Sequence, residues 1–390
     1  MELSIHRIFN FFSPKRLIFG CDAIAQLGIE ARGLGGSKAL IVTDKGIVQC
    51  GLLENVQPYL DAAGISSFVF DKVAADAPLG IVEECARCIK ENGIDIVIGL
   101  GGGSSIDTAK AASVMATNPG SLVDYCGNDS LRKPGLPKIL IPTTAGTGSE
   151  ATRVFIFTDE KAGMKKALYS DYVLADIAIV DPILTVAMPP TVTLDTGLDA
   201  LIHAIEAYVS KTATPFSDLM ALEAIRLIAK NLPIAYAKGD SLSARYGMSL
   251  GALTAGLAFG SGGLGAIHGL AYPLASEYHL THGRSTLILL PHVMAFNLIG
   301  DPDKYARIGE AMGETLSDGL TVMEKAEKTL TAVQRWLSEL NVSTRLRDYQ
   351  IPKENIDHLA KESMKFSRLF ASNPRILQID DAKGIFEKAW

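Results

Sequence analysis

Short apolar runs recur along the first half of the chain, and most of them end in a polar or small residue. The runs span residues 38–44, 67–71, 94–100, 138–144 and 177–181. Between the first three runs, residues 51–63 and 78–92 carry apolar side chains at helical spacing. This alternation of strands and helices predicts a parallel sheet covered by helices on both faces. Ligands bind such sheets at the carboxyl ends of the strands.

A break at Met188-Pro189-Pro190 precedes a second half in which no strand pattern is evident. Helical spacing predicts helices over residues 194–210, 217–231, 241–259, 302–312, 322–340 and 353–364. We therefore expect an α/β domain with a parallel sheet over residues 1–187, followed by an all-α domain over residues 188–390. The cleft between the two domains is the expected functional site.

One uncharged stretch is long enough to cross a bilayer, because residues 246–276 contain no Asp, Glu, Lys or Arg. Glycines interrupt it repeatedly, and it also contains His268. We interpret it as a buried helix, a tight loop and the start of another helix, and we expect no membrane association.

The composition narrows the class of protein. With 390 residues, of which 48% are hydrophobic and 21% charged, the chain can bury a large core. A formal charge of −6 and the lack of a basic stripe argue against nucleic acid as a partner, so small molecules are expected. Five cysteines in a chain of this length, without a charged and then apolar leader, indicate a reducing cytoplasm.

Candidate metal ligands lie in the second half. Asp199 and His203 are four residues apart in a predicted helix, so their side chains share one helical face. His268 and His282 follow in a cluster of four histidines within 25 positions. Together these residues suggest a metal site, although a buried histidine with a hydrogen-bond partner is the commoner case. Asp195 lies one helical turn before Asp199, and spacing leaves open which carboxylate would bind.

Two glycine-rich loops follow predicted strands. Residues 99–110 read Gly-Leu-Gly-Gly-Gly-Ser-Ser-Ile-Asp-Thr-Ala-Lys and run into a helix, where glycines and the helix N-terminus can hold a pyrophosphate. The alternative is a tight turn capped by Ser104 or Ser105. Residues 142–150, Pro-Thr-Thr-Ala-Gly-Thr-Gly-Ser-Glu, form a second loop rich in hydroxyls, which is either a nucleotide contact or a turn.

Asp44 ends the first strong strand. A carboxylate at this place can accept hydrogen bonds from both ribose hydroxyls of a nucleotide and repel a 2′-phosphate. An Asp before Lys45-Gly46 also forms turns readily, and the pattern alone favours the turn.

In combination, these motifs resemble the iron-containing (group III) alcohol dehydrogenases over nearly the whole chain. The matching segments include Asp199-Ala-Leu-Ile-His203-Ala-Ile-Glu-Ala-Tyr208, His268-Gly, His282-Gly and Asn373-Pro-Arg375, besides Asp44 and both glycine-rich loops. The resemblance implies the dehydroquinate synthase-like fold, with a dinucleotide-binding N-terminal domain and a helical metal-binding domain. It implies a homodimer or a higher homo-oligomer as well.

The resemblance also assigns residues. It implies Asp199, His203, His268 and His282 as the metal ligands, against Asp195. It places the NAD pyrophosphate at Gly101, Gly102, Gly103 and Ser104, the adenosine at Thr143 and Thr144, and the ribose at Asp44. Asp107, Thr147 and Ser149 of the same motifs complete the expected cofactor contacts. Phe259 and Ser261 are expected to line the substrate pocket.

Tyr272 marks a departure from the family pattern. Many relatives have a histidine at this position, four residues after the third ligand, as a proposed proton relay. A second departure is Gly260-Ser261-Gly262, which carries little side-chain volume where relatives are bulkier. Tyr272 is therefore an open candidate for the relay, and the pocket is expected to be wider or more polar.

We accordingly predict an NAD-dependent and metal-dependent oxidoreductase that interconverts a short, polar aldehyde and its primary alcohol. The metal would polarise the carbonyl oxygen. Fe²⁺ follows from the resemblance, whereas the ligand types also suit Zn²⁺ or Mn²⁺. The alternatives are a polyol dehydrogenase of the glycerol type that uses zinc, or a non-redox lyase of the dehydroquinate synthase type.

Overall fold

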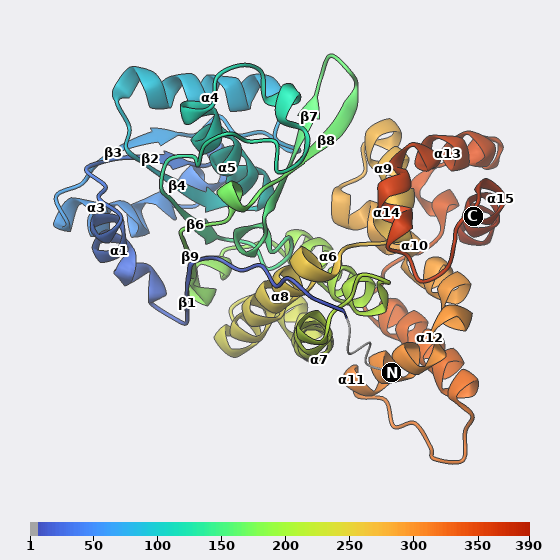
Figure 1. Ribbon diagram of the computed structural model, residues 1–390. Coiled ribbons are helices and arrows are strands. Elements are labelled where there is room, and N and C mark those ends of the chain that lie inside the picture. The colour runs from blue at the N-terminus through green and yellow to red at the C-terminus, as the bar shows by residue number, and fades with distance from the viewer. Residues whose placement is uncertain (1–6) are drawn as a thin grey trace. The chain divides into compact units, whose positions relative to one another are not determined.

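The computed structural model describes residues 7–390, which form two compact units (Figure 1). The sheet unit comprises residues 13–201 and 226–256. The helical unit comprises residues 202–225 and 257–390, together with residues 7–12 of the described chain. The chain passes between the units within three helices: α6 (Pro190–Val209), α7 (Pro215–Ala237) and α8 (Leu242–Gly262).

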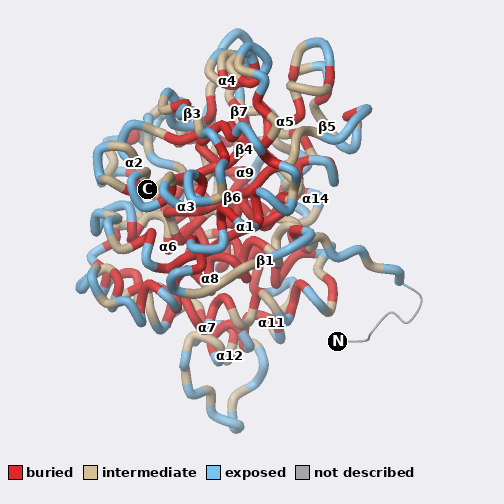
Figure 2. Tube along the Cα trace, turned by 90° about the vertical axis from the view of Figure 1, so that its left-hand side faces the viewer, coloured by how far each residue is buried: buried red, intermediate tan, exposed pale blue. Residues whose placement is uncertain are grey.

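The sheet unit is built on a six-stranded sheet, in which all the pairings are parallel. Its strands, in spatial order, are β1 (Arg16–Phe19), β9 (Ile177–Val180), β6 (Lys138–Pro142), β4 (Ile96–Gly101), β2 (Lys38–Val42) and β3 (Ser66–Phe70). Five of them coincide with the predicted apolar runs, so the parallel sheet is confirmed, and β1 is the addition. Strands β4 and β6 are buried along their whole length (Figure 2).

Helices cover both faces of this sheet. Neighbouring residues of each strand point to opposite sides, so every strand contributes side chains to both faces. Ile41 and Ile98 pack with α1 (Leu27–Gly33) and α3 (Gln57–Ala62) on one face. Leu40 and Val97 pack on the other face with α4 (Leu79–Asn92) and α5 (Gly103–Thr117). Burying each such aliphatic side chain stabilises the fold by roughly 1.5–3 kcal/mol. A strand that is buried on both faces of the sheet therefore requires a continuous run of apolar residues.

A second, three-stranded sheet was not predicted. Its strands are β5 (Gly127–Asn128), β8 (Met164–Tyr169) and β7 (Val154–Asp159), and β7 and β8 form an antiparallel pair. Phe155 and Phe157 of β7 pack into a core with residues of α4 and α5. The small sheet thus covers helices of the sheet unit and fixes the segment that leads out of the second glycine-rich loop.

The helical unit contains only helices and connecting segments within its described residues, in agreement with the all-α prediction. Helix α9 packs on α10, α11 on α12, and α13 on both α9 and α15. Their bounds are α9 (Ala266–Tyr278), α10 (His282–Asn297), α11 (Pro302–Ala311), α12 (Val322–Glu339), α13 (Ile356–Ser363), α14 (Ser367–Ala371) and α15 (Ile379–Ala389).

The uncharged stretch of residues 246–276 forms parts of two helices separated by a short loop, as predicted. Helix α8 ends at Gly262, residues 263–265 form a loop, and α9 begins at Ala266. Within residues 7–390, no single helix is long and apolar enough to cross a membrane. Helices α8 and α9 would suffice together by length and composition, but they are bent by 107° at the loop.

Candidate active site

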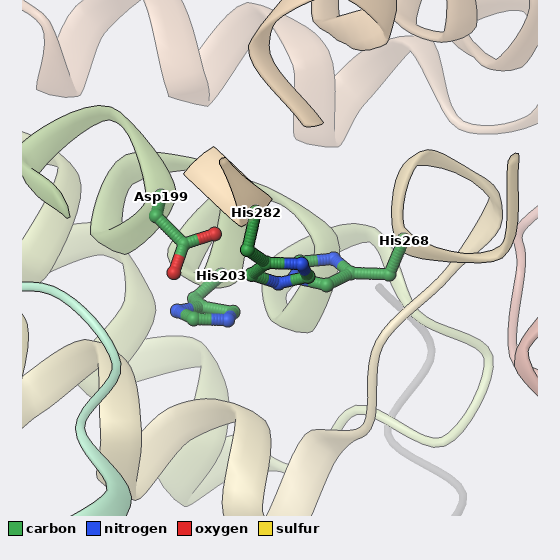
Figure 3. A group of neighbouring side chains, drawn as sticks. All are labelled: Asp199, His203, His268 and His282. Atoms are coloured by element: carbon green, nitrogen blue, oxygen red, sulfur yellow. The ribbon is translucent and has the colours of Figure 1, made fainter. Parts of the chain in front are cut away.

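Four side chains form a group that can hold a metal ion. Asp199 and His203 lie on α6, His268 lies on α9, and His282 is the first residue of α10 (Figure 3). One ligand atom from each lies within 4.8 Å of all the others. Asp199, His203 and His268 are buried, and His282 is partly exposed. The structure thus brings together the four ligands expected from the resemblance.

Local sequence explains how the four ligands are placed. Asp199 and His203 are one turn apart on α6, where Leu198, Leu201 and Ile202 are fully buried and fix which face points inward. Helix α9 ends at Tyr278, and the next residue, His279, has a left-handed φ of 54°, a conformation that commonly ends helices. Residues 279–281 connect α9 to α10, which starts with His282.

Two of the three imidazole rings are stacked on each other, and one of these is also stacked on a neighbouring phenyl ring. The centroids of His203 and His268 are 4.8 Å apart with an angle of 15° between the planes. The His282 ring lies 5.3 Å from that of His268. Phe259 stacks on His203 at 4.5 Å, so this predicted pocket residue contacts a candidate metal ligand directly. Packing of this kind restricts the rotation of the ligand rings.

The chemistry of the four donors fits a divalent transition metal. Three imidazole nitrogens and one carboxylate oxygen suit Fe²⁺, Zn²⁺ or Mn²⁺. Asp195 lies one turn earlier on α6 and is not a member of the group among the described residues.

Sequence reasoning missed one residue of this region. Glu206 is buried on α6, and its Oε2 atom lies 2.6 Å from Nδ1 of His268. The signal was present, since Asp199, His203 and Glu206 stand at positions i, i+4 and i+7 and so share one helical face.

A cavity of about 990 Å³ lies in the sheet unit, beside the carboxyl ends of β2, β4 and β6. This volume is at the upper end of the roughly 300–1,000 Å³ usual for small-molecule sites. Seven of the ten predicted cofactor residues line it: Asp44, Gly102, Gly103, Ser104, Thr143, Thr144 and Thr147. Gly101, Asp107 and Ser149 are not among its lining residues in the described chain.

The first glycine-rich loop has the form of an anion cradle. Helix α5 begins at Gly103 after Gly102, which offers no side-chain cap, so the N–H groups of the first turn face the cavity end of the helix. Gly101 has φ 148°, and a Cβ there would lie 2.6 Å from Oγ of Ser105. A Cβ on Gly103 would lie 2.7 Å from Cγ2 of Thr147. A side chain at either position would force the neighbouring Ser105 or Thr147 to shift, and glycine leaves the backbone open to a phosphate.

Asp44 has two roles in the structure. Its Oδ1 accepts hydrogen bonds from the amides of Gly46 (2.8 Å) and Ile47 (3.2 Å), which caps the short helix α2 (Lys45–Gln49). Its Oδ2 accepts a hydrogen bond from the Ser105 hydroxyl at 3.3 Å. Asp44 also lines the cavity, so a turn-forming role and a nucleotide contact are compatible.

Asp107 and Ser149 connect the two glycine-rich loops to each other. The Ser149 hydroxyl donates to Asp107 Oδ1 at 2.5 Å, and Asp107 Oδ2 accepts from the amide of Ile156. Buried Lys110 donates to oxygens of Ser149, Thr152 and Val154. Burial lowers the pKa of Lys110 to about 8, against the opposing effect of the Asp107 charge. These contacts fix the shape of the loops around the cavity.

Glu150 follows Ser149 and is buried too. Burial raises the pKa of its carboxyl to about 7. Its Oε2 atom has no hydrogen-bond partner among the described residues. A carboxyl in this setting favours the neutral form.

The two remaining pocket candidates have definite neighbours. Tyr272 on α9 stacks face to face on Phe366, with centroids 4.2 Å apart and an angle of 16° between the rings. The Ser261 hydroxyl accepts a hydrogen bond from the amide of Phe12 at 3.0 Å.

Comparison with known proteins gives two family matches that together cover most of the chain. Residues 14–182 match the iron-containing alcohol dehydrogenase model, and residues 193–390 match the C-terminal model of the Fe-containing alcohol dehydrogenase family. The chain belongs to the iron-containing alcohol dehydrogenase family. The family and fold inferred from the sequence motifs are thereby confirmed, as is the class of enzyme.

Individual relatives match over nearly their full length. Long-chain-alcohol dehydrogenase 1 of Geobacillus thermodenitrificans (strain NG80-2) is 40% identical, covering 97% of this chain and 97% of the relative. The NAD-dependent methanol dehydrogenase of Bacillus methanolicus is 38% identical, covering 97% and 99%. The crystal structure of a 1,3-propanediol oxidoreductase superposes with a TM-score of 0.96 at 38% identity, covering 98% of this chain and all of that one.

Proposed function

We propose that this family member is an NAD-dependent and iron-dependent oxidoreductase that interconverts a short, polar aldehyde and its primary alcohol. The observation that carries the proposal is the group of three histidines and one aspartate, whose ligand atoms lie within 4.8 Å of one another. The cavity at the glycine-rich loops supports the use of a dinucleotide. A relative named as NAD-dependent supports NAD as that dinucleotide.

When bound, the metal supplies Lewis-acid polarisation of the substrate oxygen, and the nicotinamide supplies or accepts the hydride. The chain supplies the residues that would hold both groups. Asp199, His203, His268 and His282 would hold the metal, and the backbone at Gly102 and Gly103 would bind the pyrophosphate at the N-terminus of α5. Burial of three of the four ligands keeps water away from the donor atoms, which strengthens electrostatic interactions there.

Gly101, Asp107 and Ser149 remain part of the proposed cofactor site in a supporting role. Gly101 permits the close turn before α5, and Asp107 and Ser149 hold the loops together. Asp44 is proposed to bind the adenosine ribose through the carboxylate that lines the cavity, with Thr143 and Thr144 beside it.

The named relatives differ in substrate, since they are long-chain alcohol, methanol and 1,3-propanediol enzymes. The identity of the substrate is therefore the most specific part of the proposal. A short and polar substrate is supported by the sequence Gly260-Ser261-Gly262, which brings little apolar volume to the segment after Phe259. Phe259 and Tyr272 are proposed to form aromatic walls, since Phe259 contacts the ligand His203 and Tyr272 lies one turn after the ligand His268.

The test is a substrate panel with anaerobically iron-loaded protein and NADH. The panel contains aldehydes of two to four carbons, in plain, hydroxylated and anionic forms, together with a long-chain aldehyde. We expect NADH oxidation with the highest kcat/KM for a hydroxylated or anionic short aldehyde. A preference for the long-chain aldehyde contradicts the substrate assignment. Preference for glycerol in zinc-loaded protein supports the polyol alternative, and absence of net NADH turnover supports the lyase.

Three wider properties belong to the same proposal. The family matches to residues 14–182 and 193–390 support functional domains that meet near residue 188. The five cysteines are all free thiols, which supports a reducing cytoplasmic location. Assembly into a homodimer or higher homo-oligomer is proposed from the resemblance, and size-exclusion chromatography with light scattering tests it.

A further inference from the structure

The carboxylate of Glu206 accepts two hydrogen bonds from neighbouring residues of α9. Oε1 accepts from the backbone amide of Ile267 at 2.6 Å, and Oε2 accepts from Nδ1 of His268 at 2.6 Å. Glu206 and His268 are both buried, each with 4% of its side chain exposed. One carboxylate from α6 thus contacts both the first turn of α9 and the imidazole that this turn carries.

The first turn of α9 depends on such side chains because it has no cap of its own. Gly265 precedes the helix and offers no side chain to the free amides. Asn373 Oδ1 accepts from the amide of Ala266 at 3.2 Å, and Glu206 accepts from the next amide. A Cβ on Gly265 would come within 3.1 Å of both acceptors, so glycine allows both to approach. Asn297 holds Asn373 in turn, with a hydrogen bond of 2.9 Å to the same Oδ1.

We propose that Glu206 is a positioning residue for the metal ligand His268. The hydrogen bond at Nδ1 places the imidazole proton on that nitrogen, so Nε2 is the ligand atom. The second hydrogen bond, to the Ile267 amide, ties the carboxylate to the backbone that carries the ring. A carboxylate partner of this kind fixes the ring plane and raises the basicity of the ligand, which is typically worth 10–100-fold in metal affinity.

A purely structural cap is the competing explanation, and one substitution separates the two. A cap for Ile267 needs only one acceptor oxygen. The side chain of Glu206→Gln keeps one oxygen but has an NH₂ group in place of the other, so it can accept only one of the two N–H groups. The variant can therefore preserve the cap while losing the contact with Nδ1.

The matched control is Glu277→Gln. Glu277 lies near the other end of α9 and pairs with His358, the closest oxygen being 3.0 Å from Nε2. This pair is exposed, and neither residue belongs to the metal group. The control makes the same carboxylate-to-amide change in a second glutamate–histidine pair, which joins α9 to α13. It therefore measures the effect of replacing a carboxylate by an amide where the histidine is not a proposed metal ligand.

The experiment measures binding of Co²⁺ to metal-free full-length protein, by competition with a chromophoric chelator. We expect Glu206→Gln to bind Co²⁺ 10–100-fold more weakly than wild type, with an altered cobalt absorption spectrum. Thermal unfolding of its metal-free form should stay close to wild type, and Glu277→Gln should bind as wild type does. Wild-type affinity and an unchanged spectrum in Glu206→Gln would overturn the inference.

A second variant keeps the test decisive if Glu206→Gln does not fold. Glu206→Asp retains the charge but is one methylene shorter, so it cannot keep both hydrogen bonds, and its Co²⁺ affinity should also fall. An affinity equal to wild type overturns the inference. The inference rests on the proposed metal site, whose own failure looks different: wild type would bind no Co²⁺, or His268→Ala would bind it as tightly as wild type.

Discussion

The imidazole rings of His203 and His268 lie nearly parallel, 4.8 Å apart, although they come from helices separated by more than 50 residues in the chain. One ligand atom of each ring lies within 4.8 Å of the other and of ligand atoms of Asp199 and His282. The arrangement makes each of the four side chains necessary for a complete site, which leads to the first prediction.

Replacing His268 or His282 by alanine leaves three ligands, so metal affinity and turnover should fall together. Asp195→Ala should spare both, because Asp195 is outside the group within the described chain. Metal quantified per chain, alongside kcat with a saturating aldehyde, checks this. Full metal occupancy with normal turnover in His268→Ala would contradict the ligand assignment.

A second prediction concerns the choice between NADH and NADPH. Asp44→Ser keeps an oxygen that can cap α2 but removes the charge that lines the cavity. Loss of a charge-assisted hydrogen bond to the ribose costs about 1.5–3 kcal/mol, roughly tenfold to a hundredfold in NADH binding. NADPH should improve because repulsion of its 2′-phosphate is gone.

The measurement for Asp44 is the ratio of kcat/KM for the two cofactors. Asp44→Gly provides the comparison, since it removes the charge and the side-chain cap together and should lower the unfolding midpoint as well. If the ratio does not change in either variant, Asp44 acts only as the cap of α2.

The buried carboxyl of Glu150 predicts a pH dependence of stability. Its pKa rises from 4.5 to about 7 on folding because burial disfavours the charge. A raised pKa in the folded state stabilises the protein at low pH, and this contribution is lost as pH rises through about 4.5 to about 7. We therefore expect the folded chain to lose stability across this range as the carboxyl is forced to ionise inside the protein.

Urea unfolding across this pH range checks the Glu150 prediction. Glu150→Gln does not titrate, so its stability relative to wild type should increase as the pH is raised toward 7. The exposed Glu83→Gln on α4 serves as the control and should follow wild type at every pH. Parallel curves for wild type and Glu150→Gln would show that Glu150 keeps the same pKa in the folded and unfolded chain.

The large sheet was predictable because each of its central strands is buried on both faces, which demands a continuous apolar run. Strand β1 was not predicted because Arg16 and Leu17 are exposed, so its four residues do not form a continuous buried apolar run. The β7–β8 pair was not predicted for another reason. Val154–Asp159 alternates between partly and fully buried positions, and it follows the hydroxyl-rich loop of residues 142–150, whose sequence indicates a nucleotide contact or a turn.

The metal group was predictable only in part. The spacing of Asp199 and His203 establishes a shared helical face, but the place of His268 and His282 depends on how α9 and α10 pack, which spacing cannot state. The resemblance supplied that information. Glu206 was missed because its partner, the first turn of α9, is 61 residues away along the chain.

Tyr272 gives the last prediction, which concerns the proton required by the alkoxide that hydride transfer leaves. Its ring stacks on Phe366 with centroids 4.2 Å apart, and a phenylalanine at this position would keep that stack. An alkoxide is basic enough to take a proton from water or from the cofactor ribose, so it does not require the phenol. Tyr272→Phe should therefore keep most of the turnover and leave both limbs of the pH profile unchanged, as measured by steady-state kinetics across pH. A loss of two or more orders of magnitude in kcat, with normal NADH and metal binding, would identify the phenol as the relay instead.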